Sequence, residues 1–180
     1  MSPHDPRPLT GEPLSLDLLN TRWIEDGRPR DLLGDVDGLG VWLHANGLDD
    51  GRFVADDLTL RRTLQARDAL LAVVDGSLEE GAARVDAVLG EGRIRATLTT
   101  AGGGERAEFA DASWGPGWLA ARNYLELLAT APDRIRHCAH EACVLHFFDT
   151  SRNGTRRWCS MAACGNRAKA SRHYARSKDS

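Results

Sequence analysis

The stretch CAHEACVLHFFDTSRNGTRRWCSMAAC runs from Cys138 to Cys164 and contains every cysteine of the chain. The cysteines form two pairs of C-x4-C spacing, Cys138 with Cys143 and Cys159 with Cys164. No apolar export signal precedes them, so we expect a cytoplasmic protein whose thiols stay reduced. Two matched cysteine pairs in that setting predict a tetrahedral Zn²⁺ site with four thiolate ligands.

Other interpretations fit the same residues. The four thiols could be structural and metal-free, or an exported protein could join them in disulfides. His137, His140 and His146 lie close by in the sequence and could replace a cysteine, although a histidine beside a metal site is more often outside the ligand set.

The residues around the cysteines predict a small hairpin followed by a helix. The segment from Val144 to Phe148 is short, apolar and aromatic, which favours a strand, and Asp149 to Gly154 has the composition of a turn. Ser160 is expected to cap a helix that runs to about Arg176. So small a unit cannot bury enough apolar surface alone, and a bound metal would supply part of its folding free energy.

The charge of the chain changes sign where a helical pattern meets Pro132. Residues 1–132 hold 22 acidic residues and 13 arginines, a net charge of −9, whereas residues 133–180 hold 10 basic and 4 acidic residues, a net charge of +6. We therefore expect two domains, 1–132 and 133–180. A basic end indicates a polyanion partner or a solvated tail.

The expected helix after the last cysteine has two different faces. Small residues fall near that cysteine on a helical wheel, and Lys169, Arg172 and Arg176 fall away from it. Together with Arg156 and Arg157 they could neutralise several phosphates of a nucleic acid. The alternative is a solvated basic face, or arginine side chains paired with the acidic body.

The segment DTSRNGTRRWCSMAACGNRAKASR, from Asp149 to Arg172, resembles the CGNR zinc finger, whose name is spelled by Cys164-Gly165-Asn166-Arg167. The segment LSLDLLNTR, from Leu14 to Arg22, resembles the ABATE domain that precedes this finger in other proteins. Together the two resemblances cover nearly the whole chain. They imply a bacterial, stress-linked transcription regulator with a DNA-binding finger.

The body is expected to be helical with one β-hairpin. Glu12 to Trp23 is ambiguous between helix and strand, and Pro13 favours helix. A turn-rich loop is expected over Gly27 to Asp35. Hydrophobic periodicity and capping residues predict further helices over residues 36–45, 56–74, 77–89 and 118–130. Residues 93–100 and 105–110 would form the hairpin around the glycines at 102–104. The predicted fold class is therefore α+β, predominantly α-helical, with a helical body and a small zinc-finger module made of a hairpin and a helix.

Polar residues in apolar surroundings give a second functional hypothesis, a small-molecule effector site in the body. Asp17, Asn20 and Arg22 interrupt an apolar segment, and Arg67 falls on the apolar stripe of the helix at 56–74. A buried arginine needs a partner, and Asp17 or an anionic ligand would serve. An internal ion pair is the favoured interpretation.

Other classes of protein have less support. A zinc ion with four cysteine ligands keeps no open position for water, and the motifs of zinc hydrolases, deaminases and serine hydrolases are absent, so an enzyme is not expected. No apolar run is long enough to span a bilayer, which excludes an integral membrane protein. A homo-oligomer is possible, because DNA-binding proteins of this size are often dimers.

Overall fold

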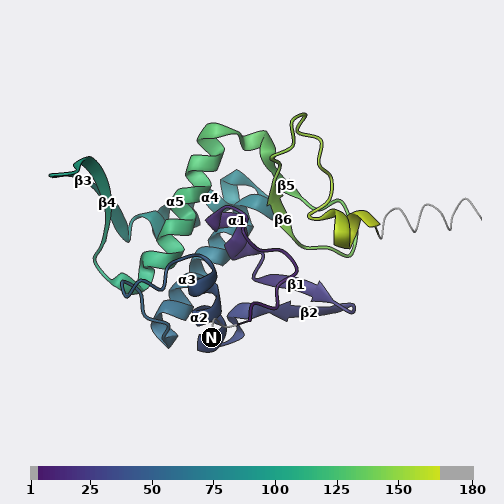
Figure 1. Ribbon diagram of the computed structural model, residues 1–180, viewed down its shortest axis with the longest axis horizontal. Coiled ribbons are helices and arrows are strands. Elements are labelled where there is room, and N and C mark those ends of the chain that lie inside the picture. Colours follow the sequence, from purple (N-terminus) through teal and green to yellow (C-terminus); the bar gives the residue numbers. More distant parts are fainter. Residues whose placement is uncertain (1–3, 167–180) are drawn as a thin grey trace, which may run out of the picture.

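The computed structural model describes residues 4–166, and its body is built around the short helix α1 (Leu14–Leu19). This helix is almost completely buried, and it contacts α5 (Gly115–Thr130), α3 (Asp57–Leu71) and strand β6 (His146–Phe148) (Figure 1). The helical interpretation of the ambiguous N-terminal segment is confirmed for α1. The chain then turns into strand β1 (Arg22–Glu25), so the helix ends before Trp23.

Helices α2 (Val36–Ala45) and α4 (Leu78–Leu89) form as expected, and each begins at a capping side chain. The Asp35 side chain accepts a hydrogen bond from the Gly38 amide at 2.8 Å, and Ser77 accepts one from the Glu80 amide at 3.2 Å. Each cap satisfies an amide that the first helical turn leaves unpaired.

Helix α3 ends earlier than predicted and buries a different set of side chains. It ends at Leu71 and continues as one wide turn, Ala72–Gly76. Small and polar side chains make up most of its buried face, and the expected leucine stripe is only half-buried. The reason is the close approach of α5, where a Cβ on Gly117 would lie 2.6 Å from the Ala66 methyl carbon.

The expectation of a single body hairpin is wrong. Over residues 4–132 the body contains two hairpins, and the loop expected over residues 27–35 is partly strand β2 (Arg28–Asp31), which pairs antiparallel with β1. Asp26 and Gly27 connect them with φ values of 50° and 74°, the left-handed pair of a two-residue hairpin turn. The polar strand residues concealed this hairpin, because neither face shows apolar alternation.

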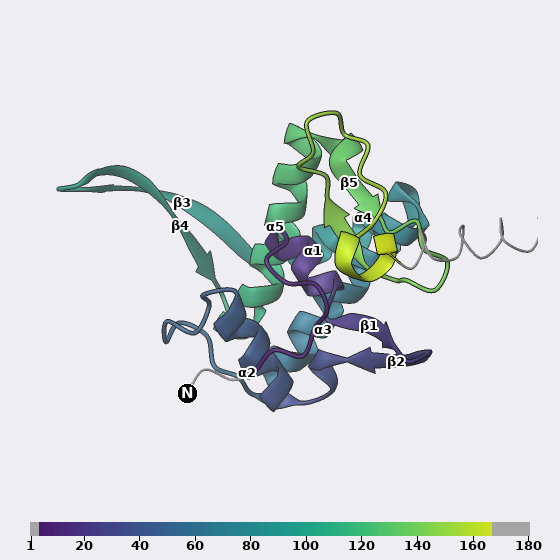
Figure 2. The same ribbon diagram turned by 45° about the vertical axis from the view of Figure 1, so that its right-hand side comes forward.

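The second body hairpin is long and points away from the helices (Figures 1 and 2). Strands β3 (Gly92–Thr99) and β4 (Gly102–Phe109) pair along their full length. The expected glycine turn is displaced, because the three glycines lie inside β4 and residues 100–101 make the turn. A third hairpin, β5 (Ile135–His137) with β6, belongs to the C-terminal module.

One continuous apolar core joins the body to this module. Trp42 and Leu18 of the body and Phe147 of β6 are essentially inaccessible members of the same cluster. The two segments on either side of residue 132 therefore share one hydrophobic core. That they are separate domains stays a prediction. No helix within residues 4–166 is both long and apolar enough to cross a membrane.

The two glycines of α2 should respond oppositely to alanine. A Cβ on Gly38 would lie 1.6 Å from the Leu32 carbonyl oxygen, so the backbone must move, whereas a Cβ on Gly40 would meet only Ala55 at 3.9 Å. We expect Gly38→Ala to lower the free energy of unfolding by about 1–3 kcal/mol. Gly40→Ala should raise it by about 0.5–1 kcal/mol, since alanine is the better helix former. Urea denaturation followed by circular dichroism measures both, and equal effects would contradict the packing described for α2.

Candidate metal centre

Four short backbone segments bring the cysteines together. Cys138 follows β5, and its amide donates to the Leu145 carbonyl at 2.9 Å. Cys143 closes a tight turn with a hydrogen bond from its amide to the His140 carbonyl at 2.8 Å. Cys159 follows the turn after β6, and Cys164 lies in the wide helical turn Met161–Gly165. The thiol sulfur atoms of all four cysteines lie within 4.8 Å of one another.

The sulfur positions fit a tetrahedral metal ion. The Sγ atoms of Cys143 and Cys159 are 3.8 Å apart, and those of Cys159 and Cys164 are 3.6 Å apart. Zinc–sulfur bonds of about 2.3 Å imply tetrahedral S···S edges of about 3.8 Å. The same distances are far too long for disulfide bonds, and all four cysteines are free. The amide of Cys159 also points at the Cys138 sulfur, at 3.4 Å.

The pKa values of the clustered thiols favour a bound cation at this centre. Hydrogen bonding from Cys159 lowers the pKa of Cys143 to about 5, and the same contact raises the pKa of Cys159. Burial raises the pKa of Cys164 to about 12. Negative charge on one sulfur therefore keeps its neighbours protonated. A dication would offset two of the four negative charges and stabilise the thiolates, so these residues can hold Zn²⁺, and its binding would release protons.

Arg156 and Arg157 adjoin the centre but have different surroundings. The Arg156 guanidinium lies over the Phe147 ring at 4.3 Å and donates to the carbonyls of Trp158, at 2.9 Å, and Cys159. The guanidinium donors of Arg156 are therefore directed toward the metal loop rather than toward solvent. Arg157 is exposed beside the Trp158 ring. The other expected nucleic-acid residues, Lys169, Arg172 and Arg176, lie outside the described residues, as does most of the expected C-terminal helix.

The module is attached to the body by buried hydrogen bonds. The Asn20 side-chain amide donates to the His146 carbonyl, and its oxygen accepts from the His146 amide, each at 2.8 Å. The His146 ring lies 2.8 Å from the Asp75 carboxylate, and the Phe148 amide donates to Glu12 at 2.8 Å. These contacts come from the strand between its two cysteine pairs, and Arg156 adds an ion pair with Glu12 at 3.6 Å. No periodicity marks Glu12 or Asp75, and the sequence analysis missed both.

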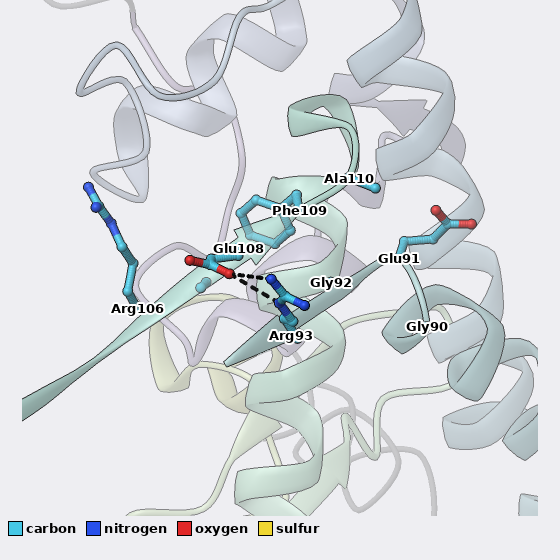
Figure 3. Close-up of a pocket in the computed structure, with 9 residues that line it drawn as sticks. Gly90, Glu91, Gly92, Arg93, Arg106, Glu108, Phe109 and Ala110 are labelled. Atoms are coloured by element: carbon cyan, nitrogen blue, oxygen red, sulfur yellow. Dashed lines mark hydrogen bonds and ion pairs between the residues drawn. The ribbon is translucent and has the colours of Figure 1, made fainter. Parts of the chain in front are cut away.

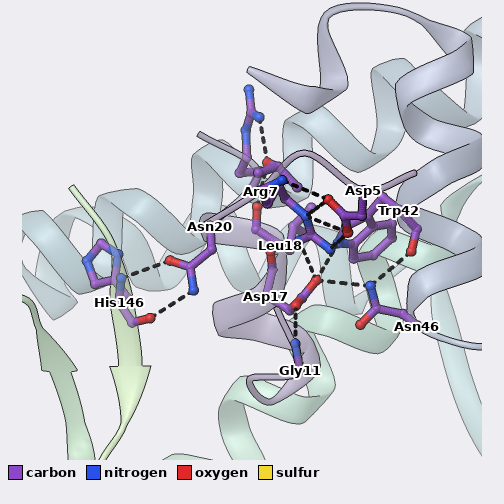
Figure 4. Close-up of polar contacts among 11 residues, drawn as sticks. Asp5, Arg7, Gly11, Asp17, Leu18, Asn20, Trp42, Asn46 and His146 are labelled. Atoms are coloured by element: carbon purple, nitrogen blue, oxygen red, sulfur yellow. Dashed lines mark hydrogen bonds and ion pairs between the residues drawn. The ribbon is translucent and has the colours of Figure 1, made fainter. Parts of the chain in front are cut away.

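The four residues expected to bind a ligand do not form one site. Asp17 is a buried hub that accepts hydrogen bonds from Arg7 at 2.7 Å, Trp42 at 3.0 Å and Asn46 at 3.0 Å (Figure 4). Asn20 faces the module on the other side of α1. These contacts give both side chains structural roles.

The expected pairing of Arg67 with Asp17 is wrong. Arg67 instead makes two hydrogen bonds to the Asp31 carboxylate, at 2.7 and 2.8 Å, and one to the Thr21 hydroxyl at 2.8 Å. The Asp17 carboxylate is instead paired with Arg7. Asp31 lies at the end of β2, in a segment that we expected to be a loop. The favoured interpretation, an internal ion pair, holds with this different acid.

Arg22 differs from the other three because it is exposed. It lines a cavity of about 160 Å³ where β1, the end of α3 and Val144 meet. Trp23 and Leu71 supply apolar walls, and Asp75 lies at the same cavity.

Two protein families match the chain in consecutive segments. Residues 12–131 match ABATE, described as "Putative stress-induced transcription regulator", and residues 134–177 match the CGNR zinc finger. The second match contains all four clustered cysteines. No curated protein matches the chain.

Zinc content should depend on the cysteines and not on the neighbouring histidine. We expect one zinc ion per chain, and Cys159→Ser should abolish stable binding, because three thiolates and a hydroxyl form a weaker site. His140→Ala is the control and should retain zinc. Because protons compete for the thiolates, zinc should dissociate as the pH falls. Elemental analysis after gel filtration measures all three results, and loss of zinc from the histidine variant would overturn the four-cysteine assignment.

The Asn20 contact should couple the body to the metal centre. Asn20→Ala leaves the amide and carbonyl of His146 buried without partners, so the free energy of unfolding should fall by about 2 kcal/mol or more. Zinc should also transfer faster to a chelator, since His146 lies on the strand between the cysteine pairs. Asn153→Ala, at an exposed position of the module, is the matched control. Equal chelation rates for the two variants would separate the body from the centre.

Proposed function

The chain belongs to the ABATE family, and on that premise we propose that it is a transcription regulator that binds DNA through its C-terminal zinc finger. The family description points to a regulator rather than an enzyme. The four cysteines would fill every position of a tetrahedral zinc ion, so the metal would serve to fold the finger.

The charge distribution carries the DNA-binding proposal. The finger segment has a net charge of +6 beside a body of −9, so the basic residues are concentrated in the part of the chain that contains the four cysteines. Arg136, Arg152 and Arg157 are exposed on the described part of the finger. Cations in such a cluster gain affinity for a phosphate backbone through the release of counterions.

Different basic residues have different roles in this proposal. Arg157, with Lys169, Arg172 and Arg176, would contact phosphate. Arg156 would support these contacts from inside, because its guanidinium is held by carbonyls of the metal loop and by the Phe147 ring. These contacts position the finger on a duplex and do not by themselves select a base sequence.

A small-molecule effector function has one supporting observation, the cavity lined by Arg22. The cavity touches Val144 of the finger and Asp75, which contacts His146, so a small anion bound there would lie between body and finger. In this alternative the finger serves structure or protein docking. DNA binding that is absent even at low salt would favour it.

DNA binding by the zinc-loaded chain should weaken steeply with salt. Each phosphate contact contributes about 0.9 to the slope of log K against log salt, so replacing Lys169, Arg172 and Arg176 together by alanine should flatten the slope by about 3. Arg157→Ala should flatten it by about 1. Arg52→Ala, which removes an exposed arginine of the body paired with Asp50, should leave it unchanged.

Fluorescence anisotropy with a generic duplex measures these slopes. Chelation of the zinc should abolish binding, because the finger loses its fold. An unchanged slope in the triple variant would overturn the proposed face. The absence of any binding at low salt would overturn the DNA-binding function itself.

A further inference from the structure

Helices α4 and α5 contact each other and leave an apolar groove between them (Figure 1). The groove has a volume of about 440 Å³, which is within the range of small-molecule sites. Most of the side chains in its walls are aliphatic, and two large ones are open to water, Leu78 at 65% and Leu125 at 44% exposure. A ligand that covered them would gain free energy, because each Å² of apolar surface removed from water contributes about 25 cal/mol.

Packed backbone bounds the groove near both ends. At one end the Trp118 indole of α5 donates a hydrogen bond to the Leu89 carbonyl of α4 at 2.8 Å. At the other end the wide turn Ala72–Gly76 packs on α4, where a Cβ on Gly81 would lie 2.2 Å from the Val73 Cγ2 atom. A bounded groove of this size suits a small molecule better than a helix of a partner protein, which is about 10 Å across.

Asp86 gives the groove a negative charge without a partner. Its carboxylate is exposed, and no basic group among residues 4–166 lies within ion-pair distance of it. Asp86 also lies in the last turn of α4, where the helix dipole disfavours an acid. Its charge therefore does not stabilise the helix and is available to a cation from outside.

Tyr124 of α5 supplies the second polar group of the groove. The residue is only 5% exposed, and its hydroxyl group has no hydrogen-bond partner within the part of the chain that the structure describes. The hydroxyl oxygen is not completely enclosed, so it is open to a molecule in the groove. Buried tyrosine hydroxyls usually have a partner, and a polar group of a ligand would provide one.

A larger hollow at the root of the β3–β4 hairpin, of about 700 Å³, differs in its charges (Figure 3). Arg93 and Glu108 in its wall form an ion pair at 2.9 Å, and Arg106 and Glu91 add one further charge of each sign. These charges cancel, so that hollow favours neither an anion nor a cation. In the α4–α5 groove, by contrast, Asp86 is the one charged residue among the described lining residues.

We propose that the α4–α5 groove binds a small hydrophobic amine, whose apolar part fills the groove while its ammonium group pairs with Asp86. The Tyr124 hydroxyl accepts a hydrogen bond from the bound molecule. A neutral alcohol of the same shape lacks the ion pair, and a carboxylic acid brings a like charge to Asp86. The site is separate from the cavity lined by Arg22, where a small anion would bind.

Isothermal titration calorimetry with the full-length, zinc-loaded chain tests the ligand chemistry. Octylamine should bind about fivefold more tightly than octanol, which corresponds to one ion pair at the surface, and octanoate should bind most weakly of the three. Butylamine carries the same charge on less apolar surface and should bind at least about tenfold more weakly than octylamine. Absence of octylamine binding, equal affinity for the three octyl compounds, or equal affinity for the two amines would overturn the proposal.

Three exposed positions of α4 test the location of the site. Asp86→Asn should remove the preference for octylamine over octanol and leave octanol binding unchanged. Ala82→Trp should abolish binding of both compounds, because Ala82 lies one turn from Leu78 and from Asp86 and a ring there would fill the groove. Ala87→Trp, which puts the same ring outside the groove, is the matched control and should bind both compounds as the unmodified chain does.

All three positions are exposed, so the variants should fold, as circular dichroism verifies. Octylamine binding that persists in Ala82→Trp would overturn the placement in the groove. A preference for octylamine that persists in Asp86→Asn would overturn the role of the carboxylate.

Discussion

The polar residues in and after α1 hold the rest of the molecule in place. A helix of six residues has no stability of its own, because the cost of nucleation exceeds what so few hydrogen bonds return. Here each buried polar side chain reaches a different part of the structure, so the helix acts as a common anchor. Ser15 contacts the Asn123 side chain of α5, and Asp17 contacts the Arg7 guanidinium. Asn20 contacts the backbone of His146 in the finger, and Thr21 contacts Arg67 of α3.

This arrangement explains how so small a finger can be ordered. The metal ligands tie together its loops, and the body covers the other side of β6, where Phe147 is fully buried and Asn20 pairs with both backbone groups of His146. Neither support is sufficient alone, because the four thiols cannot all ionise without a cation and a short two-stranded sheet does not persist in water. The state of the body and the metal affinity of the finger are therefore thermodynamically linked.

Local signals in the sequence predicted local features, and partner identities had to come from the structure. Cysteine spacing predicted the clustered thiols, and the capping residue Ser77 predicted where α4 begins. The need of Arg67 for an acid was also predictable, since a charge in an apolar stripe cannot stay unpaired. Arg67 pairs with Asp31 because β2 follows the Asp26-Gly27 turn and places Asp31 beside it. The sequence did not predict this strand, because the residues around the turn are polar. The sequence likewise does not reveal that the Arg156 guanidinium packs over the Phe147 ring while the neighbouring Arg157 side chain faces solvent.

The β3–β4 hairpin and the finger occupy different ends of the molecule, and this separation has a functional consequence (Figures 1 and 2). Helix α5 lies between them, with the hairpin rooted near its first turns and the finger following its last turn. A partner bound at the hairpin would therefore leave the exposed arginines of the finger uncovered, so the two ends of the molecule can make separate contacts.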